Sequence, residues 1–443
     1  MASNMDASIQ HSNGGLTSSS TGSVNSPALR AQDDEKQEQD IIPNGGIKAW
    51  LQVFGAFLLF FNSWGVINTF GAYQTYYEFN LLQARSSSTI SWIGTFQGFI
   101  LITFSIVGGP IFDRGYFRHL IVGGSFFLVF GMMMTSLCSE YYQLFLAQGL
   151  CVGLGAGAIF LPSVAIVATY FTTKRALATG ITAAGGSVGS VIYTIIFRKL
   201  QPRIGFAWST RVIGFIALGC LIVSLAIMRS RAPPRSKTHQ QARKMVDLSA
   251  FKSIPFLICI AGMFLAFIGL YIPFFYIIAY AETHANVTED MSFYLLSIMN
   301  AASAFGRIIP GLLADRLGSV PVMAACTLAS AVLIYAWIAI NSLAGLIVFS
   351  ILYGFVSGAV VSLPVTTVAF LVPDLSKVGT WMGMAFCFSG LGFLIGNPIA
   401  GTLTNVENDD YIRGIVFAAS CVVAGGTVFS MLVGYLSFLK RKS

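Results

Sequence analysis

The chain has 443 residues, of which 55% are hydrophobic and only 10% are charged. A soluble domain carries nearer a quarter of charged residues, so this composition excludes an ordinary soluble protein and indicates a polytopic membrane protein. The net charge of +8 does not require nucleic acid as a partner, because the basic residues of a membrane protein gather in its cytoplasmic loops.

Residues 1–46 are rich in Ser, Asn, Gly and Gln and carry an acidic cluster between Asp33 and Asp40. Such a composition cannot bury a core and predicts a disordered cytoplasmic tail. A phosphorylated or degradation-controlling segment is the alternative interpretation. No cleavable signal peptide is expected, since the first apolar run begins only near Trp50.

From Ile47 onward, apolar runs of about 20 residues follow one another, each long enough to cross the ~30 Å hydrocarbon core of a lipid bilayer. They predict an all-α membrane protein with twelve transmembrane helices in two pseudo-symmetric six-helix bundles, residues 47–228 and 253–438. A basic cytoplasmic linker, 229–252, joins the bundles, and 439–443 form a short cytoplasmic tail. The expected spans are 48–72, 89–110, 119–138, 143–169, 176–198, 207–228, 254–280, 291–312, 319–340, 343–370, 378–400 and 412–438.

The distribution of basic residues predicts the orientation. With the N-terminus in the cytoplasm, 19 of the 26 Lys and Arg residues fall on that side and 5 on the other, so both termini are expected to be cytoplasmic. The plasma membrane is the expected location, with the vacuolar membrane as the alternative. Arg198, Lys199 and Arg203 stand against the rule, and the sequence offers no reason for them.

A charged turn occurs twice. Gly109 to Arg114 and Gly311 to Arg316 both read Gly-x-x-x-Asp-Arg, with Asp113 and Asp315 separated by 315 − 113 = 202 residues. Pro162 and Pro364 have the same separation, which indicates a two-fold repeat. Asp113, Arg114, Asp315 and Arg316 are therefore predicted to act as cytoplasmic gate latches in a rocking transporter, the alternative being charged loops fixed by topology alone.

These loops, the twelve spans and the central basic linker resemble the major facilitator superfamily. Within it, the stretch from Tyr170 to Gly185 is similar to the span 4–5 signature of the monocarboxylate porter family, and residues 43–50 are similar to that family's entry into span 1. The resemblance covers roughly residues 43–440 and implies a fungal-type secondary transporter whose halves rock around a central small-molecule site. No Gly-Lys-Ser/Thr follows the glycine runs, so an ATP-binding loop is not expected.

Span 7 carries Tyr271, Phe275 and Tyr276 around Pro273. Together with the intramembrane amides of Asn68 and Asn300, these aromatic residues predict a pocket for a larger, partly aromatic ligand, with ordinary packing as the alternative. The loop after span 7 contains the sequon Asn286-Val-Thr288, which the charge count places outside. Asn286 is therefore a predicted glycosylation site.

Arg307 is the best candidate for a substrate-binding residue. A guanidinium offers two parallel donors to a carboxylate, and the resemblance implies this role, because the arginine at the matching position of the porter family binds the substrate carboxylate. A bond to a carbonyl freed by Pro310, or snorkelling to the cytoplasmic face, are the alternatives. Lactate–proton porters of that family carry an aspartate one turn earlier, where this chain has Ser303, so proton-coupled lactate transport is not expected.

The sequence therefore predicts a secondary transporter that moves a small organic anion or metabolite, monocarboxylate-like or larger, by alternating access. Export of a fungal secondary metabolite is the alternative, and a non-transporting nutrient sensor is an alternative of another class. The seven cysteines lie in apolar runs without a CxxC pair, and the four histidines are scattered. No metal, cofactor, catalytic residue or enzyme activity is expected, and the sequence sets no oligomeric state.

Overall fold

A computed structural model describes residues 45–113, 115–171, 175–229, 247–372, 378–404 and 410–442. Residues 1–44 of the predicted tail, most of the linker, and Arg114 lie outside these ranges, and α2 already begins at Gly46, the last residue of that tail. Helices make up nearly all regular structure in the described residues: α2 (Gly46–Asn68), α3 (Phe70–Tyr76), η1 (Tyr77–Leu81), α4 (Ser87–Thr103), α5 (Ser105–Asp113), α6 (Phe117–Thr135), α7 (Tyr141–Leu144), η2 (Phe145–Val152), α8 (Gly153–Tyr170), α9 (Arg175–Ile227), η4 (Leu248–Lys252), α10 (Ile254–Leu270), α11 (Ile272–Thr283), α12 (Glu289–Leu317), α13 (Ser319–Trp337), α14 (Leu343–Ser362), α15 (Pro364–Leu371), α16 (Val378–Leu403) and α17 (Ile412–Lys442).

Eleven helical tracts within the described ranges are long and apolar enough to cross a membrane. One of them, Leu177–Ile227, has 51 residues and is long enough to cross twice, since a helix rises about 1.5 Å per residue. The turn between its two passes lies at Gly205, whose φ of 78° and ψ of 170° suit a residue without a Cβ. The twelve spans expected from the sequence are therefore present, and α9 contains spans 5 and 6, which are separated by the turn at Gly205.

The helix starts repeat at a fixed spacing. α4 and α12, α6 and α13, and α7 and α14 begin at positions that are 289 − 87 = 202, 319 − 117 = 202 and 343 − 141 = 202 residues apart. The repeat expected from the charged turns and the prolines is thus also present in the secondary structure. Equivalent helices of the first and second halves can be compared residue by residue with this offset.

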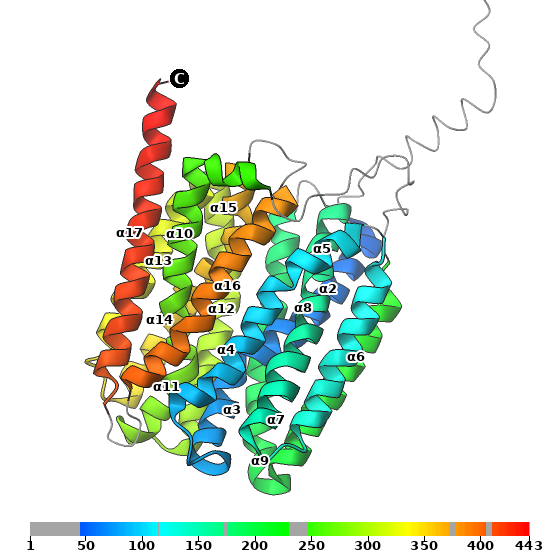
Figure 1. The fold of residues 1–443 in the computed structure, drawn as a ribbon, viewed down its shortest axis with the longest axis vertical. Coiled ribbons are helices and arrows are strands. Elements are labelled where there is room, and N and C mark those ends of the chain that lie inside the picture. The colour runs from blue at the N-terminus through cyan, green and yellow to red at the C-terminus, as the bar shows by residue number, and fades with distance from the viewer. Residues whose placement is uncertain are drawn as a thin grey trace, which may run out of the picture. The chain divides into compact units, whose positions relative to one another are not determined.

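Two long seams join the first half, up to α9, to the second half, from α10. α9 packs along α12, and α4 packs along α16; Figure 1 shows α4 and α16 side by side. These two seams are equivalent under the repeat, because α4 corresponds to α12 and α16 corresponds to the first pass of α9. A polar side chain on the facing sides of these helices lies between the two halves.

Within the second half, α12 and α14 cross at a very short distance. Gly306 of α12 faces the backbone of Phe355, and Gly354 of α14 faces the backbone of Met299. A Cβ on Gly354 would lie 2.9 Å from the Met299 carbonyl carbon and 3.0 Å from the Ala302 Cβ, so only glycine fits. This crossing fixes the position of α12, the helix that carries Arg307.

We expect Gly354→Ala to destabilise the protein by about 1–3 kcal/mol, because the added methyl group must push α12 and α14 apart. Gly434→Ala is the matched control: it lies inside α17, where a Cβ would meet nothing within 4 Å, and removing a helical glycine there gains about 0.5–1 kcal/mol. Thermal unfolding of the purified proteins in detergent should therefore give a lower midpoint for Gly354→Ala and an unchanged or higher one for Gly434→Ala. Equal midpoints would show that the crossing is not tight.

Candidate functional site

Two helix breaks at equivalent positions shape the middle of the protein. The first helical tract breaks at Thr69, between α2 and α3, and its counterpart breaks at Tyr271, between α10 and α11, which is 271 − 69 = 202 residues later. Pro273 in the first turn of α11 has no N–H to donate, and the Tyr353 hydroxyl donates to the Leu270 carbonyl at 2.6 Å beside the break. The breaks position Asn68 and Tyr271 at helix ends rather than on regular helix faces.

Arg307 is buried on α12, with only 4% of its surface exposed. Its Nη1 donates a hydrogen bond of 2.8 Å to the Ala183 carbonyl of α9, so the contact crosses from the second half to the first. Gly186, one turn further along α9, leaves room for the guanidinium, since a Cβ there would lie 3.3 Å from Nη1. The accepting carbonyl belongs to α9 and is not one freed by Pro310. The guanidinium does not snorkel to the surface, because the residue is only 4% exposed.

The Arg307 guanidinium has at least one hydrogen-bond donor that is not used in the described residues. Its buried Nε has no hydrogen-bond partner among the described residues, and no carboxylate in the described ranges forms an ion pair with it. A buried charge is costly unless it is paired, and an isolated arginine in a membrane helix costs about 2.5–3.5 kcal/mol on insertion scales. A ligand that supplies a carboxylate or another acceptor would satisfy this group.

Buried aromatic rings pack near Arg307. The ring of Tyr271 stacks on Trp64 of α2 at a centroid distance of 6.3 Å and 20° between the ring planes, and Trp64 and the Arg307 guanidinium both lie against Gly186. Phe393 of α16 makes an edge contact with Tyr271 at 4.7 Å and lies 6.2 Å from Phe275. The buried Tyr271 hydroxyl has no hydrogen-bond partner among the described residues. This buried cluster is therefore aromatic and contains two polar groups without a partner in the described residues, the Arg307 Nε and the Tyr271 hydroxyl.

The other predicted pocket residues are buried, but their hydrogen bonds lead elsewhere. Tyr276 donates to the Asn397 carbonyl at 3.4 Å, and Asn300 donates to the Leu296 carbonyl of its own helix at 3.0 Å. The side-chain oxygens of Asn300 and Asn68 are buried without a partner in the described part of the chain. Phe393 links Tyr271 to Phe275, while Asn68, Asn300 and Tyr276 bond elsewhere or have no partner in the described residues. Arg307 and the five other residues predicted from the sequence all stay predictions as substrate-binding residues.

The sequence interpretation missed four contributors, Trp64, Ala183, Gly186 and Phe393. Gly186 belongs to a glycine run that indicates close helix packing, but nothing in the run shows that an arginine side chain approaches it. Ala183 acts through its backbone, which carries no sequence signal. Trp64 and Phe393 are single aromatic residues among many in a chain with 37 phenylalanines and 6 tryptophans.

The predicted gate residues are placed only in part. Asp315 and Arg316 are exposed near the end of α12, before Gly318 with its φ of 92°, and they form no ion pair with a described residue. Asp113 is the last residue of α5, and Arg114 lies outside the described ranges. The latch role of these four residues stays a prediction.

Carboxylates inside the membrane-capable tracts lie close to the tract ends. Glu78, in the η1 extension of the first tract, accepts a hydrogen bond of 3.0 Å from Gln74, and Glu282 near the end of α11 accepts one of 2.5 Å from Ser292. Glu289, Asp290 and Asp315 are within three residues of an end of their tract. In the described residues, Arg307 is therefore flanked by rings and hydroxyl groups rather than by acids.

A bundle of membrane-capable helices built from two equivalent halves, with a buried cation on the seam between them, defines a membrane transporter. The chain belongs to the major facilitator superfamily, whose family model matches residues 53–319 and 286–442. It is 45% identical to the MFS-type transporter dbaD of Emericella nidulans, over 89% of this chain and 86% of that protein. It is 37% identical to the aspyridones efflux protein apdF of the same organism, over 88% of this chain and 79% of that protein.

Solved structures show the same fold. The peptide transporter POT in complex with sulfate matches with a TM-score of 0.69 over 91% of this chain and 98% of its own, at 13% identity. The nucleoside transporter NupG matches with a TM-score of 0.65 over 87% of this chain and 99% of its own, at 15% identity. At these identities the likeness concerns the fold, which is the twelve-helix fold of the superfamily.

The two buried tyrosines of this region provide a test of the hydrogen-bond assignments. We expect Tyr271→Phe to leave the thermal stability nearly unchanged, because the lost hydroxyl has no partner in the described residues. Tyr353→Phe is the matched control and should cost about 1–3 kcal/mol, because the buried Leu270 carbonyl loses its donor. Thermal unfolding in detergent without cargo measures both variants, and a larger loss for Tyr271→Phe than for Tyr353→Phe would contradict these assignments.

Proposed function

We propose that this transporter exports a secondary metabolite whose carboxylate, or an equivalent acceptor group, binds to Arg307. The observation that carries the proposal is a buried guanidinium on the seam between the halves, with its Nε unpaired in the described residues. A protein retains such a costly group where a ligand pairs with it during the working cycle. The contact with Ala183 crosses the seam, so binding at Arg307 and movement of the halves affect the same helices.

The walls of the site support a cargo larger than lactate. Trp64, Tyr271 and Phe393 offer ring faces and edges, and aromatic side chains of this kind accommodate flat, conjugated ligands. The Tyr271 hydroxyl would give such a ligand a second hydrogen-bonding partner. Cargo with an acidic group attached to an aromatic or polyene body suits this combination.

The direction of transport is proposed from the relatives. One of them is named as an efflux protein for aspyridones, and two others are named as MFS transporters. The resemblance of residues 170–185 to the monocarboxylate porter signature supports the alternative, uptake of an organic acid. Both directions use the same site, because alternating access is reversible and follows the gradient.

The orientation proposed from the basic residues places the Gly205 end of the bundle outside and both termini in the cytoplasm. Asn286 lies at that end, in the connection between α11 and α12, where it is exposed and has a φ of 50°. An exposed asparagine in a turn is accessible to glycosylation. We place the protein in the plasma membrane, with the vacuolar membrane as the alternative.

Arg307→Ala should abolish transport of an acidic cargo while leaving the amount of protein in the membrane intact. Arg307→Lys should retain only part of the activity, because an ammonium group lacks the two parallel donors of a guanidinium. Arg211→Ala is the matched control: Arg211 donates to the Ser136 hydroxyl at 3.0 Å and lies over the Trp208 ring, away from Arg307. Flux into proteoliposomes, measured with a panel of carboxylated metabolites, distinguishes the three, and unchanged flux in Arg307→Ala would remove this residue from the site.

The orientation has its own test. If the Gly205 end is outside, the protein expressed in a fungal host should migrate as a glycoprotein, and treatment with an N-glycosidase should increase its mobility on a gel. Asn286→Gln should migrate like the treated protein and be unaffected by the enzyme. If Asn286 is not glycosylated, but a sequon introduced at the opposite end of the bundle is, the orientation is the reverse of the one proposed.

A further inference from the structure

The basic cluster that the topology rule leaves unexplained has partners in the structure. Arg198, near the end of the first pass of α9, forms ion pairs with Glu289 and with Asp290, the latter at 3.0 Å between Nε and Oδ1. Its guanidinium also lies over the Phe293 ring, 5.2 Å from the centroid, so the acids and the ring all come from the first turns of α12. The charge of Arg198 is therefore paired within the protein.

These contacts join the two halves. α9 ends the first half and α12 lies in the second, and the Arg198 side chain is only 11% exposed where it crosses between them. Glu289 and Asp290 also stand at the N-terminus of α12, where negative charge is favoured by the helix dipole. The two acids are therefore held in place by their helix, ready to bind a cation from α9.

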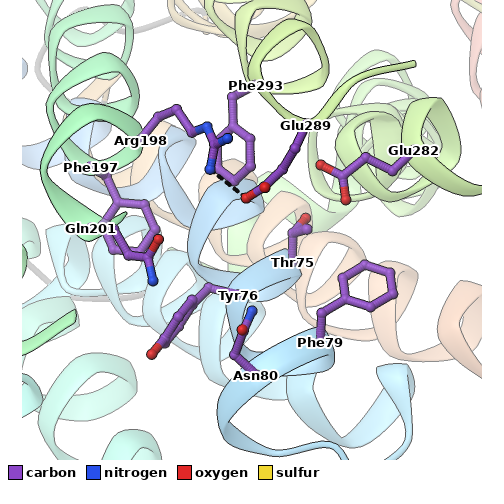
Figure 2. A pocket seen from close by; sticks show the side chains of 10 residues that line it. All are labelled: Thr75, Tyr76, Phe79, Asn80, Phe197, Arg198, Gln201, Glu282, Glu289 and Phe293. Atoms are coloured by element: carbon purple, nitrogen blue, oxygen red, sulfur yellow. Dashed lines mark hydrogen bonds and ion pairs between the residues drawn. The ribbon is translucent and has the colours of Figure 1, made fainter. Parts of the chain in front are cut away.

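A pocket of about 240 Å³ lies directly beside the ion pairs. Figure 2 shows Arg198 and Glu289 joined at one side of it, with Tyr76, Asn80 and Gln201 on the side of the first half and Glu282 on the side of the second. Thr75, which also lines the pocket, is buried. Arg198 and Glu289 thus form a wall of a cavity that belongs to both halves, at the Gly205 end of the seam.

In the described residues, the equivalent seam between α4 and α16 carries no ion pair. Asp290 corresponds to Ser88 of α4, since 290 − 88 = 202, and Ser88 donates a neutral hydrogen bond of 2.7 Å to the Pro398 carbonyl of α16. The inner contact of Arg307 with Ala183 also lies on the α9–α12 seam. Fifteen residues separate Ala183 from Arg198 along α9, which corresponds to about 22 Å. The α9–α12 seam therefore carries two arginines, Arg307 at its middle and Arg198 at its Gly205 end.

We propose that Arg198, Glu289 and Asp290 form a reversible clasp that closes the α9–α12 seam at the Gly205 end and must open for cargo to pass there. The proposal rests on the proposed function in one respect, that the halves move apart at this end during transport. The side chains of Glu289 and Asp290 are 61% and 62% exposed. Each ion pair is therefore weak and shifts the equilibrium between the closed and open states by roughly two- to fivefold. Such a weak contact can break in every transport cycle.

The clasp is tested by the accessibility of Thr75→Cys in the purified full-length protein, held in nanodiscs so that both faces are reachable. The rate of maleimide labelling at position 75 is measured by peptide mass spectrometry, which separates it from the seven native cysteines. Arg198→Glu, which places three acids together, should raise this rate at least two- to fivefold. Adding Glu289→Lys and Asp290→Lys to that variant reverses the partners' charges and should return the rate to that of the parent.

Lys199→Glu is the matched control, because it makes the same charge change one residue away, where Lys199 lies over the Tyr294 ring rather than against the acids. Its labelling rate should stay at the parent value. Arg198→Gln removes the charge without adding repulsion and should give an intermediate rate, which decides the question if Arg198→Glu does not fold. Three results would overturn the clasp. The first is a parental labelling rate in both Arg198→Gln and Arg198→Glu, and the second is an equal effect of Arg198→Glu and Lys199→Glu. The third is a labelling rate that does not recover when the charges of the partners are reversed.

This readout needs no cargo, so it separates the two proposals. Loss of the Arg307 role would appear as unchanged flux in Arg307→Ala and would leave the labelling rates unaffected. Loss of the clasp would appear only in the labelling of position 75.

Discussion

The interaction on which the site depends is the hydrogen bond from Arg307 to the Ala183 carbonyl. A guanidinium that is almost fully buried in a membrane bundle needs acceptors, and among the described residues this carbonyl supplies one while Nε stays unpaired. The bond requires α12 to lie close to α9, which Gly186 permits, and the position of α12 depends in turn on its close crossing with α14. Close packing at small residues thus positions the Arg307 guanidinium on the seam between the halves, where a ligand can complete its hydrogen bonds.

The two halves are equivalent in their backbone and unequal in their charges. Helix starts and helix breaks repeat at 202 residues, yet the position equivalent to Arg307 is Ser105, and the seam of α4 and α16 carries a serine–carbonyl bond at the position of the Arg198 ion pairs. A repeated scaffold gives two gates for alternating access, whereas the cargo needs one site. Arg198 and Arg307, which both contact the other half, lie on the α9–α12 seam. In our proposals, this seam both binds the cargo and closes one end of the pathway.

The spans and the repeat could be predicted from the sequence, because apolar run length and motif spacing are local and are fixed by the bilayer thickness. The run that ends near residue 72 continues as helix to Leu81, since polar residues such as Glu78 can remain helical at a tract end, and α9 continues past the expected end of span 5. Arg307 was identifiable because a charge in an apolar run is rare. Its acceptor is a backbone atom, and the partners of Arg198 lie 91 and 92 residues away, so neither pairing leaves a pattern that a single sequence can show.

The most direct measurement of the central claim compares an acid with its own methyl ester. Competition of each with a transported cargo is measured in proteoliposomes for the native protein and for Arg307→Ala. If Arg307 binds the carboxylate, the native protein should prefer the acid by roughly tenfold or more, as expected for a charge-assisted pair, and Arg307→Ala should bind acid and ester equally weakly. The same preference for the acid in both proteins would contradict the assignment of Arg307 as the cargo-binding residue.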